Sequence, residues 1–166
     1  MRKIIAALVF LAGGAQAAQP AAPAPLTTSF AFAENVTLTP TQIIGTTPLG
    51  VRQLVPITGG TFAGPGLHGT VIPGGSDWQL RRADGSLVIE ADYMIETDDH
   101  VQIRVHNQGY VVPPHDGHPA YVRTVPQFEA PMGKYGWLND TIFVGTLGPA
   151  GDAQHRAVLV SIFKVN

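Results

Sequence analysis

Cysteine is absent from the 166-residue chain, and charged residues make up only 13% of it. Without thiols there is no disulfide, no thiolate metal site, no cysteine nucleophile and no lipidated cysteine. Globular domains typically carry about 25% charged residues, so this chain leaves much of its surface apolar or amide-rich. Such a surface suits a ligand cavity or a contact between subunits, which leaves a homo-oligomer open.

Long apolar runs and clustered basic residues are missing beyond the first residues. Arg2 and Lys3 precede the short apolar run 4–11, and Ala15-Gln16-Ala17 has the small residues of a cleavage site. We expect a signal peptide over residues 1–17 and a periplasmic or secreted protein without stable membrane insertion. A retained membrane anchor is the alternative. The mature chain has eight basic against 12 acidic residues, a charge of about −4, which argues against nucleic acid as a partner.

Proline and glycine, by contrast, are frequent, with 14 and 19 residues. Residues 18–25 form a Pro/Ala-rich tether, and 26–166 form one domain. In that domain, short β-branched and aromatic runs alternate with Gly and Pro clusters, and Asp84-Gly85 is typical of a hairpin turn. The pattern predicts an all-β fold, a single antiparallel up-and-down β-barrel, with a flat sandwich as the alternative.

Ten runs carry this strand pattern, and the links between them look like turns. The expected strands lie near residues 29–38, 52–57, 59–63, 66–72, 78–82, 87–96, 101–107, 121–128, 141–147 and 154–165. The expected links include Pro73-Gly74-Gly75, Asp98-Asp99 and Pro149-Ala150-Gly151. Over 87–96 apolar and polar residues alternate, and the sequence leaves open which face points inward.

A series of motifs from Pro56 to Val165 resembles the DUF3237 family, also labelled UPF0311. The motifs include Gly64-Pro65-Gly66, Gly74-Gly75 with Asp77-Trp78, Thr97-Asp98-Asp99, Arg123-Thr124-Val125-Pro126, Phe128-Glu129, Trp137-Leu138-Asn139 and Phe143-Val144-Gly145. The resemblance implies a small antiparallel β-barrel and does not specify a reaction. His100 departs from the family pattern, which usually has Gly at that position.

The segment 126–145 predicts where a site would lie, because it sets a carboxylate and an amide among aromatic residues. Polar groups gain nothing from an apolar interior unless they find partners, so the segment suggests the wall of a small-molecule pocket. The family-like segments supply the expected ligand-binding residues, which are Trp78, Glu90, Tyr93, Phe128, Tyr135, Trp137 and Asn139.

Acid–base chemistry is the simplest reaction type that these residues support. We expect Glu129 or Asp77 to transfer a proton and Arg123 to hold an anionic intermediate. Alternatively, Asp77 caps a turn, and Arg123 forms an ordinary ion pair with Glu129 or Glu90. The sequence has no phosphate loop, dinucleotide fingerprint or nucleophile motif, and we expect neither a cofactor nor a metal.

Three functions remain open from the sequence. The first is a barrel that binds a partly apolar, aromatic or hydroxylated small molecule. The second is a cofactor-independent isomerase, hydratase or cyclase that uses the same pocket. The third is a structural envelope protein whose barrel is filled by its own side chains.

Overall fold

The structure, a computed structural model, describes residues 23–151 and 156–166 of the chain. The expected signal peptide over 1–17 and the first part of the tether lie outside the described residues. Residues 23–27 are exposed chain ahead of the first strand. In the described ranges, no helix is long and apolar enough to span a membrane.

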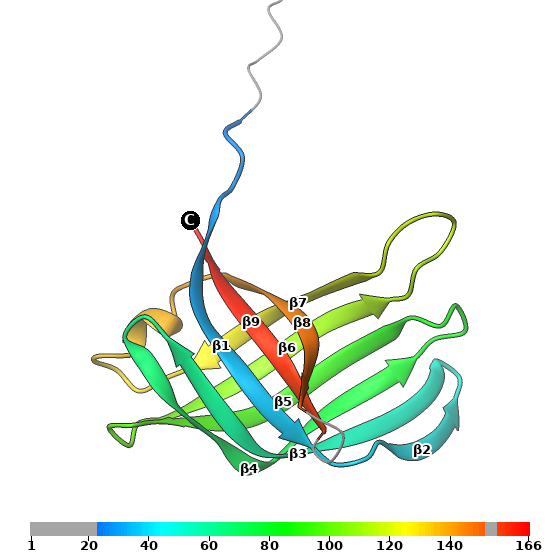
Figure 1. The fold of residues 1–166 in the computed structure, drawn as a ribbon, viewed down its shortest axis with the longest axis horizontal. Helices are drawn as coiled ribbons and strands as arrows, with labels where there is room; N and C mark the ends of the chain where they lie inside the picture. Colours follow the sequence, from blue (N-terminus) through cyan, green and yellow to red (C-terminus); the bar gives the residue numbers. More distant parts are fainter. Residues whose placement is uncertain (1–22, 152–155) are drawn as a thin grey trace, which may run out of the picture.

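Nine strands and one short 3-10 helix make up the described fold (Figure 1). They are β1 (Thr28–Leu38), β2 (Gln42–Thr47), β3 (Gly50–Gly64), β4 (Leu67–Arg81), β5 (Leu87–Thr97), β6 (Gln102–Val112), β7 (Tyr121–Glu129), η1 (Gly136–Leu138), β8 (Phe143–Gly151) and β9 (Arg156–Val165). Consecutive strands pair antiparallel from β2 to β9, as the short turn-like links predicted.

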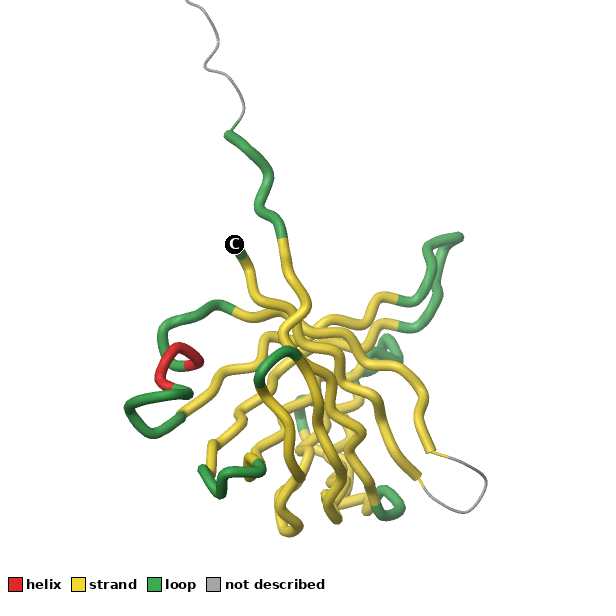
Figure 2. The backbone as a smooth tube through the Cα atoms, turned by 60° about the vertical axis from the view of Figure 1, so that its left-hand side comes forward, coloured by secondary structure: helices red, strands yellow, loops and turns green. Residues whose placement is uncertain are grey.

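The sheet closes because β1 pairs with β9 on one side and with β3 on the other. This leaves eight strands around the barrel, while β2 pairs only with β3 as the last strand of the sheet. Figure 2 shows the strands wrapping around a common interior, with the β6–β7 hairpin extending to one side. The predicted antiparallel barrel is confirmed, and the flat sandwich is excluded.

Two long strands correct the expected positions of the turns. The expected pairs of strands over 52–63 and 66–82 are instead the continuous strands β3 and β4. Pro73-Gly74-Gly75, expected as a turn, lies inside β4 at a register shift, because β-bulges accept the same residues that turns do. Pro149-Ala150-Gly151 likewise ends β8 rather than linking strands. β2 was not predicted.

Aromatic side chains fill one end of the barrel. The ring of Phe32 lies 5.9 Å from that of Phe62 and 5.6 Å from that of Phe128, which in turn lies 5.0 Å from Phe143. Tyr135 and Leu138, in the β7–β8 connection, are buried against this core. None of these side chains lines the interior cavity that is described below.

Gly64 tests the closure of the barrel, since it lies at the end of β3 in close contact with β1. A Cβ at this position would lie 2.2 Å from the Ala31 carbonyl oxygen and 2.5 Å from Phe32 Cβ. We therefore expect Gly64→Ala to lower the free energy of unfolding by about 1–3 kcal/mol, as overpacking does. Gly148→Ala in β8 is the matched control, because its Cβ would meet no atom within 4 Å. Equal urea-denaturation midpoints for the two variants would contradict this account of the closure.

Candidate functional site

A cavity of about 50 Å³ lies inside the barrel, beyond the aromatic core. Its wall is mostly aliphatic, and the aliphatic residues come from five strands: Val36, Leu38, Ile57, Ile89, Ala91, Leu147, Val158 and Val160. Asp77, Tyr93 and Asn107 are the three polar residues that line it. Few polar groups on an apolar wall are typical of a small-molecule site.

Asp77 enters this interior from β4 and is held by two hydrogen bonds. The Gln79 amide donates to one carboxylate oxygen at 2.5 Å, and the Glu90 backbone N–H donates to the other at 3.1 Å. Gln53 in β3 donates to Gln79 at 2.5 Å and so extends the chain of hydrogen bonds. Burial raises the pKa of Asp77 above its ordinary value, although the two hydrogen bonds partly oppose that rise. Asp77 is therefore fixed in position and holds a proton more readily than an exposed aspartate.

Glu34 lies deeper, completely buried, and accepts a hydrogen bond from the Tyr93 hydroxyl. The second carboxyl oxygen of Glu34 has no hydrogen-bond partner among the described residues. Burial raises the pKa of Glu34 from about 4.5 to about 7, with the Tyr93 hydrogen bond opposing the rise. The pKa of Tyr93 lies well above its ordinary value, first because of burial and then because of the Glu34 charge. At neutral pH, Tyr93 is thus a protonated donor backed by a carboxyl group that can gain or lose a proton.

The strand alternation places several of the predicted site residues on the outer face. Successive side chains of a strand point to opposite faces, so Trp78 points away from the cavity that Asp77 lines. Trp78 is 45% exposed. Glu90 likewise points outward from β5, where Ile89 and Ala91 line the cavity. The expectation that Trp78, Glu90 and Asp77 share one pocket is therefore wrong.

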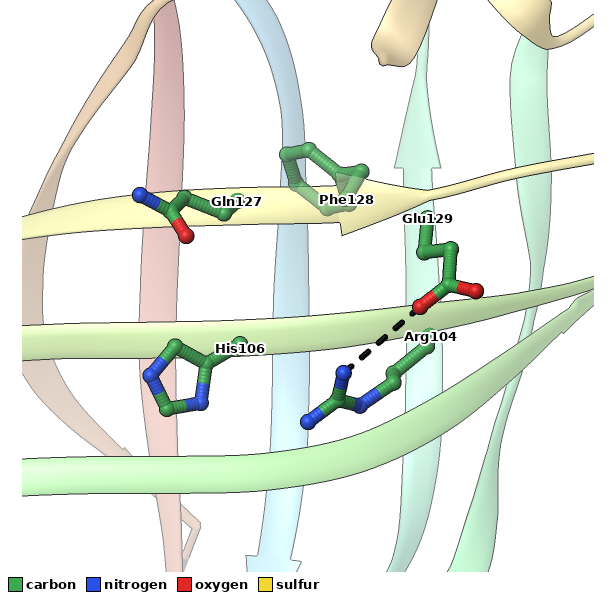
Figure 3. A pocket seen from close by; sticks show the side chains of 5 residues that line it. All are labelled: Arg104, His106, Gln127, Phe128 and Glu129. Atoms are coloured by element: carbon green, nitrogen blue, oxygen red, sulfur yellow. Dashed lines mark ion pairs between the residues drawn. The ribbon is translucent and has the colours of Figure 1, made fainter.

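The same alternation separates Phe128 from Glu129 at the end of β7. Phe128 packs into the aromatic core, whereas the Glu129 side chain is 78% exposed. Figure 3 shows Glu129 beside Arg104 on the outer face of the barrel, where their ionic groups lie 3.5 Å apart. Arg104 also makes two hydrogen bonds to Asp92 across the β5–β6 pair, at 3.1 and 2.5 Å. Exposed ion pairs of this kind contribute little to stability, and this cluster is separate from the interior cavity.

Arg123 joins neither Glu129 nor Glu90, so the expected ion pair is corrected. Its guanidinium donates to the Val122 carbonyl at 2.7 Å and lies over the Tyr121 ring on the outer surface. Its neighbour Thr124 is the one that points inward, again because of the strand alternation. Arg123 therefore lies outside the cavity in which an anionic intermediate would form.

The remaining predicted residues stabilise the β7–β8 connection. Tyr135 is buried and donates to Asp99 at 2.7 Å. Asn139 accepts from the Ala130 N–H at 2.8 Å and donates to the Ala130 carbonyl at 3.0 Å. Trp137 is 42% exposed, with its ring 5.8 Å from Phe143. These contacts bind the connection to the filled end of the barrel, away from the cavity.

Of the predicted residues, Asp77 and Tyr93 are brought together at the cavity. The sequence analysis missed Glu34, Asn107, Gln53 and Gln79. The sequence did contain a signal for Glu34, because this residue lies on the same face of β1 as three apolar residues, Phe32, Val36 and Leu38. In residues 23–151 and 156–166, no three His, Asp or Glu side chains come together as a metal site would require.

The buried carboxyl group of Glu34 predicts a specific pH dependence of stability. Because its pKa is raised from about 4.5 to about 7, the folded protein keeps a proton that the unfolded chain loses in this interval. The retained proton stabilises the folded protein, and this stabilisation is complete below pH 4.5. It is lost as the pH rises through about 7, which lowers the free energy of unfolding by about 3 kcal/mol. Glu34→Gln should remove this slope in urea denaturation, whereas the exposed-site control Glu129→Gln should keep it. Parallel pH profiles for wild type and Glu34→Gln would contradict the assignment.

Comparisons with known proteins agree with the fold and identify its relatives. A UPF0311 protein of Rhodopseudomonas palustris is 33% identical over 139 residues, which is 76% of this chain and 91% of that protein. Its crystal structure matches with a TM-score of 0.77 and 31% identity, covering 87% of this chain and 100% of the other.

A second relative, from the fungus Penicillium herquei, is called hydroalkoxylation enzyme phnH. It is 35% identical over 139 residues, covering 84% of this chain and 86% of that enzyme. The crystal structure of an enzyme from the same organism matches with a TM-score of 0.70 and 28% identity, over 89% of this chain and 100% of the other. Residues 26–165 match the family described as "Protein of unknown function (DUF3237)". The chain therefore belongs to the DUF3237 family.

Proposed function

We propose that the barrel interior binds a small, partly apolar and hydroxylated molecule and transfers protons on it without a cofactor. The observation that carries this proposal is the set of Asp77, Tyr93 and Glu34, three ionisable groups held inside an otherwise apolar barrel. Burial of unpaired acids is unfavourable for folding, and such groups with shifted pKa values concentrate at functional sites. A barrel that served only as structure would be expected to fill this space with apolar side chains.

Addition of a hydroxyl group across a carbon–carbon double bond is the reaction that suits this set. Asp77 would take the proton from the attacking hydroxyl. The Tyr93 hydroxyl would deliver a proton to the carbon that does not bond to oxygen, while the protonated Glu34 carboxyl passes its own proton to Tyr93. The product is an isomer of the substrate, since Asp77 has gained one proton and Glu34 has lost one. Proton exchange with water between turnovers then restores both carboxyl groups. The hydroalkoxylation enzyme among the relatives supports this choice within the isomerases, hydratases and cyclases.

A binding protein without turnover is the second candidate. The mostly aliphatic wall of the cavity favours it, because such a wall binds the apolar part of a ligand without reacting with it. The two candidates differ in whether protons move between the protein and the bound molecule, which can be measured directly.

Turnover of a panel of small hydroxylated alkenes, including 2-allylphenol, distinguishes the candidates. We expect wild type to cyclise at least one of them in deuterated water with one deuterium bound to carbon. Asp77→Asn should lose more than about 100-fold in rate while still binding the compound, as loss of a general base does. Glu129→Gln should retain the wild-type rate, because that carboxylate is 78% exposed on the outer face. Binding of the panel with every compound returned unchanged and without deuterium would contradict the enzyme and favour the binding protein.

Export remains part of this proposal and rests on the sequence alone. The basic start, the apolar run and the Ala15-Gln16-Ala17 motif support cleavage after Ala17 and action in the periplasm or outside the cell. The intact mass of the protein purified from its native host should correspond to a chain beginning at Ala18. A mass that includes Met1 would contradict export by this route.

A further inference from the structure

Asn107 in β6 has a buried hydrogen-bond acceptor without a partner in the described part of the chain. The residue is 4% exposed and lines the interior cavity, yet its carbonyl oxygen Oδ1 receives no hydrogen bond. Leaving such a group unpaired costs about 1–3 kcal/mol, so buried amides nearly always find a donor. Asn107 takes no part in the proton transfer proposed above, and its unpaired oxygen therefore needs a separate explanation.

The residues paired with Asn107 on the neighbouring strands have no side-chain donor. Its partner in β5 is Ala91, which has no polar side-chain group, and its partner in β7 is Pro126. Proline lacks even a backbone N–H. Because Asn107 lines the cavity, a group bound in that cavity can supply the donor for Oδ1.

Asp77, Ala91 and Asn107 form one row across β4, β5 and β6. Asp77 pairs with Ala91, and Ala91 pairs with Asn107. Neighbouring strands lie about 4.8 Å apart, so the backbones of the two polar residues are separated by roughly 10 Å. The methyl group of Ala91 lies between them and leaves open the space that a longer side chain would occupy. A ligand atom above Ala91 would thus have a hydrogen-bond acceptor on each side.

We propose that Asn107 determines the ligand specificity of this pocket by accepting a hydrogen bond from a neutral hydroxyl group placed above Ala91. The inference rests on the proposed function of the cavity as a ligand site and adds the group that the site recognises. A cavity of about 50 Å³ has room for such a hydroxyl, since one water molecule occupies about 30 Å³ in the liquid. The rest of the ligand packs against the aliphatic wall.

The same geometry excludes anionic ligands. A carboxylate would bring two further acceptors against the acceptors of Asp77 and Asn107, and like charges repel in a low dielectric. Among the described residues that line the cavity there is no Lys, Arg or His to balance its charge. An ether would fit the space but would leave the Asn107 oxygen unpaired.

Four monocyclic probes test this inference with the full mature protein in NMR titrations at pH 7. Phenol carries the neutral donor, anisole lacks it, benzoate is anionic and benzylammonium is cationic. We expect wild type to bind phenol about tenfold more tightly than anisole, and benzoate more weakly than both, because one buried hydrogen bond distinguishes the first pair. Equal affinity for phenol and anisole, or tightest binding of benzylammonium, would overturn the proposal.

Two variants and one control test whether the row of Asp77, Ala91 and Asn107 distinguishes phenol from anisole. Asn107→Leu should bring the phenol-to-anisole ratio close to one, and Ala91→Val should abolish phenol binding by filling the space between the acceptors. Gln108→Leu is the matched control, because Gln108 is the exposed neighbour of Asn107 on the same strand. The phenol-to-anisole ratio of this variant should equal that of wild type. An unchanged ratio in Asn107→Leu would overturn the inference while leaving the pocket and its proton chemistry intact. Failure of all four probes to shift any cavity resonance would overturn both the inference and the proposed function.

Discussion

The pairing of β1 with β3 is the constraint on which the interior site depends. It converts a nine-stranded antiparallel sheet into a closed barrel, and it brings Glu34 of β1 within hydrogen-bonding distance of Tyr93, 59 residues away in the sequence. Closure also removes water from both groups. The raised pKa of Glu34 is a direct result, because burial is the largest cause of its shift. The same backbone pairing thus sets both the shape and the acidity of the interior.

The two ends of the interior are used differently. Four phenylalanines and the β7–β8 connection fill one end, so that the barrel is stabilised by dense apolar packing there. The other end keeps a small cavity with Asp77, Tyr93 and Asn107 on its wall. The charged cluster of Arg104, Asp92 and Glu129 lies on the outer surface instead, where water screens its ion pairs. The interior combines exclusion of water with ionisable groups, which is why we propose that the chemistry takes place there.

Local sequence signals were sufficient to predict the fold but not to predict which residues form the candidate site. The Asp84-Gly85 hairpin and the alternating strand over 87–96 predicted antiparallel pairing, and the structure has both features. By contrast, the predicted site combined Asp77 with Trp78 and Phe128 with Glu129, which are neighbours in sequence and therefore point to opposite faces of a strand. The family resemblance drew attention to the motifs without showing which of their residues face inward.

Other parts of the site could not be found from local patterns at all. The contact between Glu34 and Tyr93 arises only when the first strand closes the barrel, and no nearby motif marks it. Asn107 is paired in the register with Ala91 and Pro126, and among the described residues its side-chain oxygen has no hydrogen-bond partner. The strand breaks expected at Pro73-Gly74-Gly75 were wrong for a related reason, since a bulge and a turn use the same residues and only strand pairing distinguishes them.

The most direct test of this account is a crystal structure of the protein soaked with phenol. We predict ordered density inside the barrel, with the phenol oxygen above Ala91 and within hydrogen-bonding distance of Asn107 Oδ1. Density for phenol only at the outer cluster of Arg104 and Glu129, with the interior cavity unchanged, would contradict the claim that the barrel interior is the functional site.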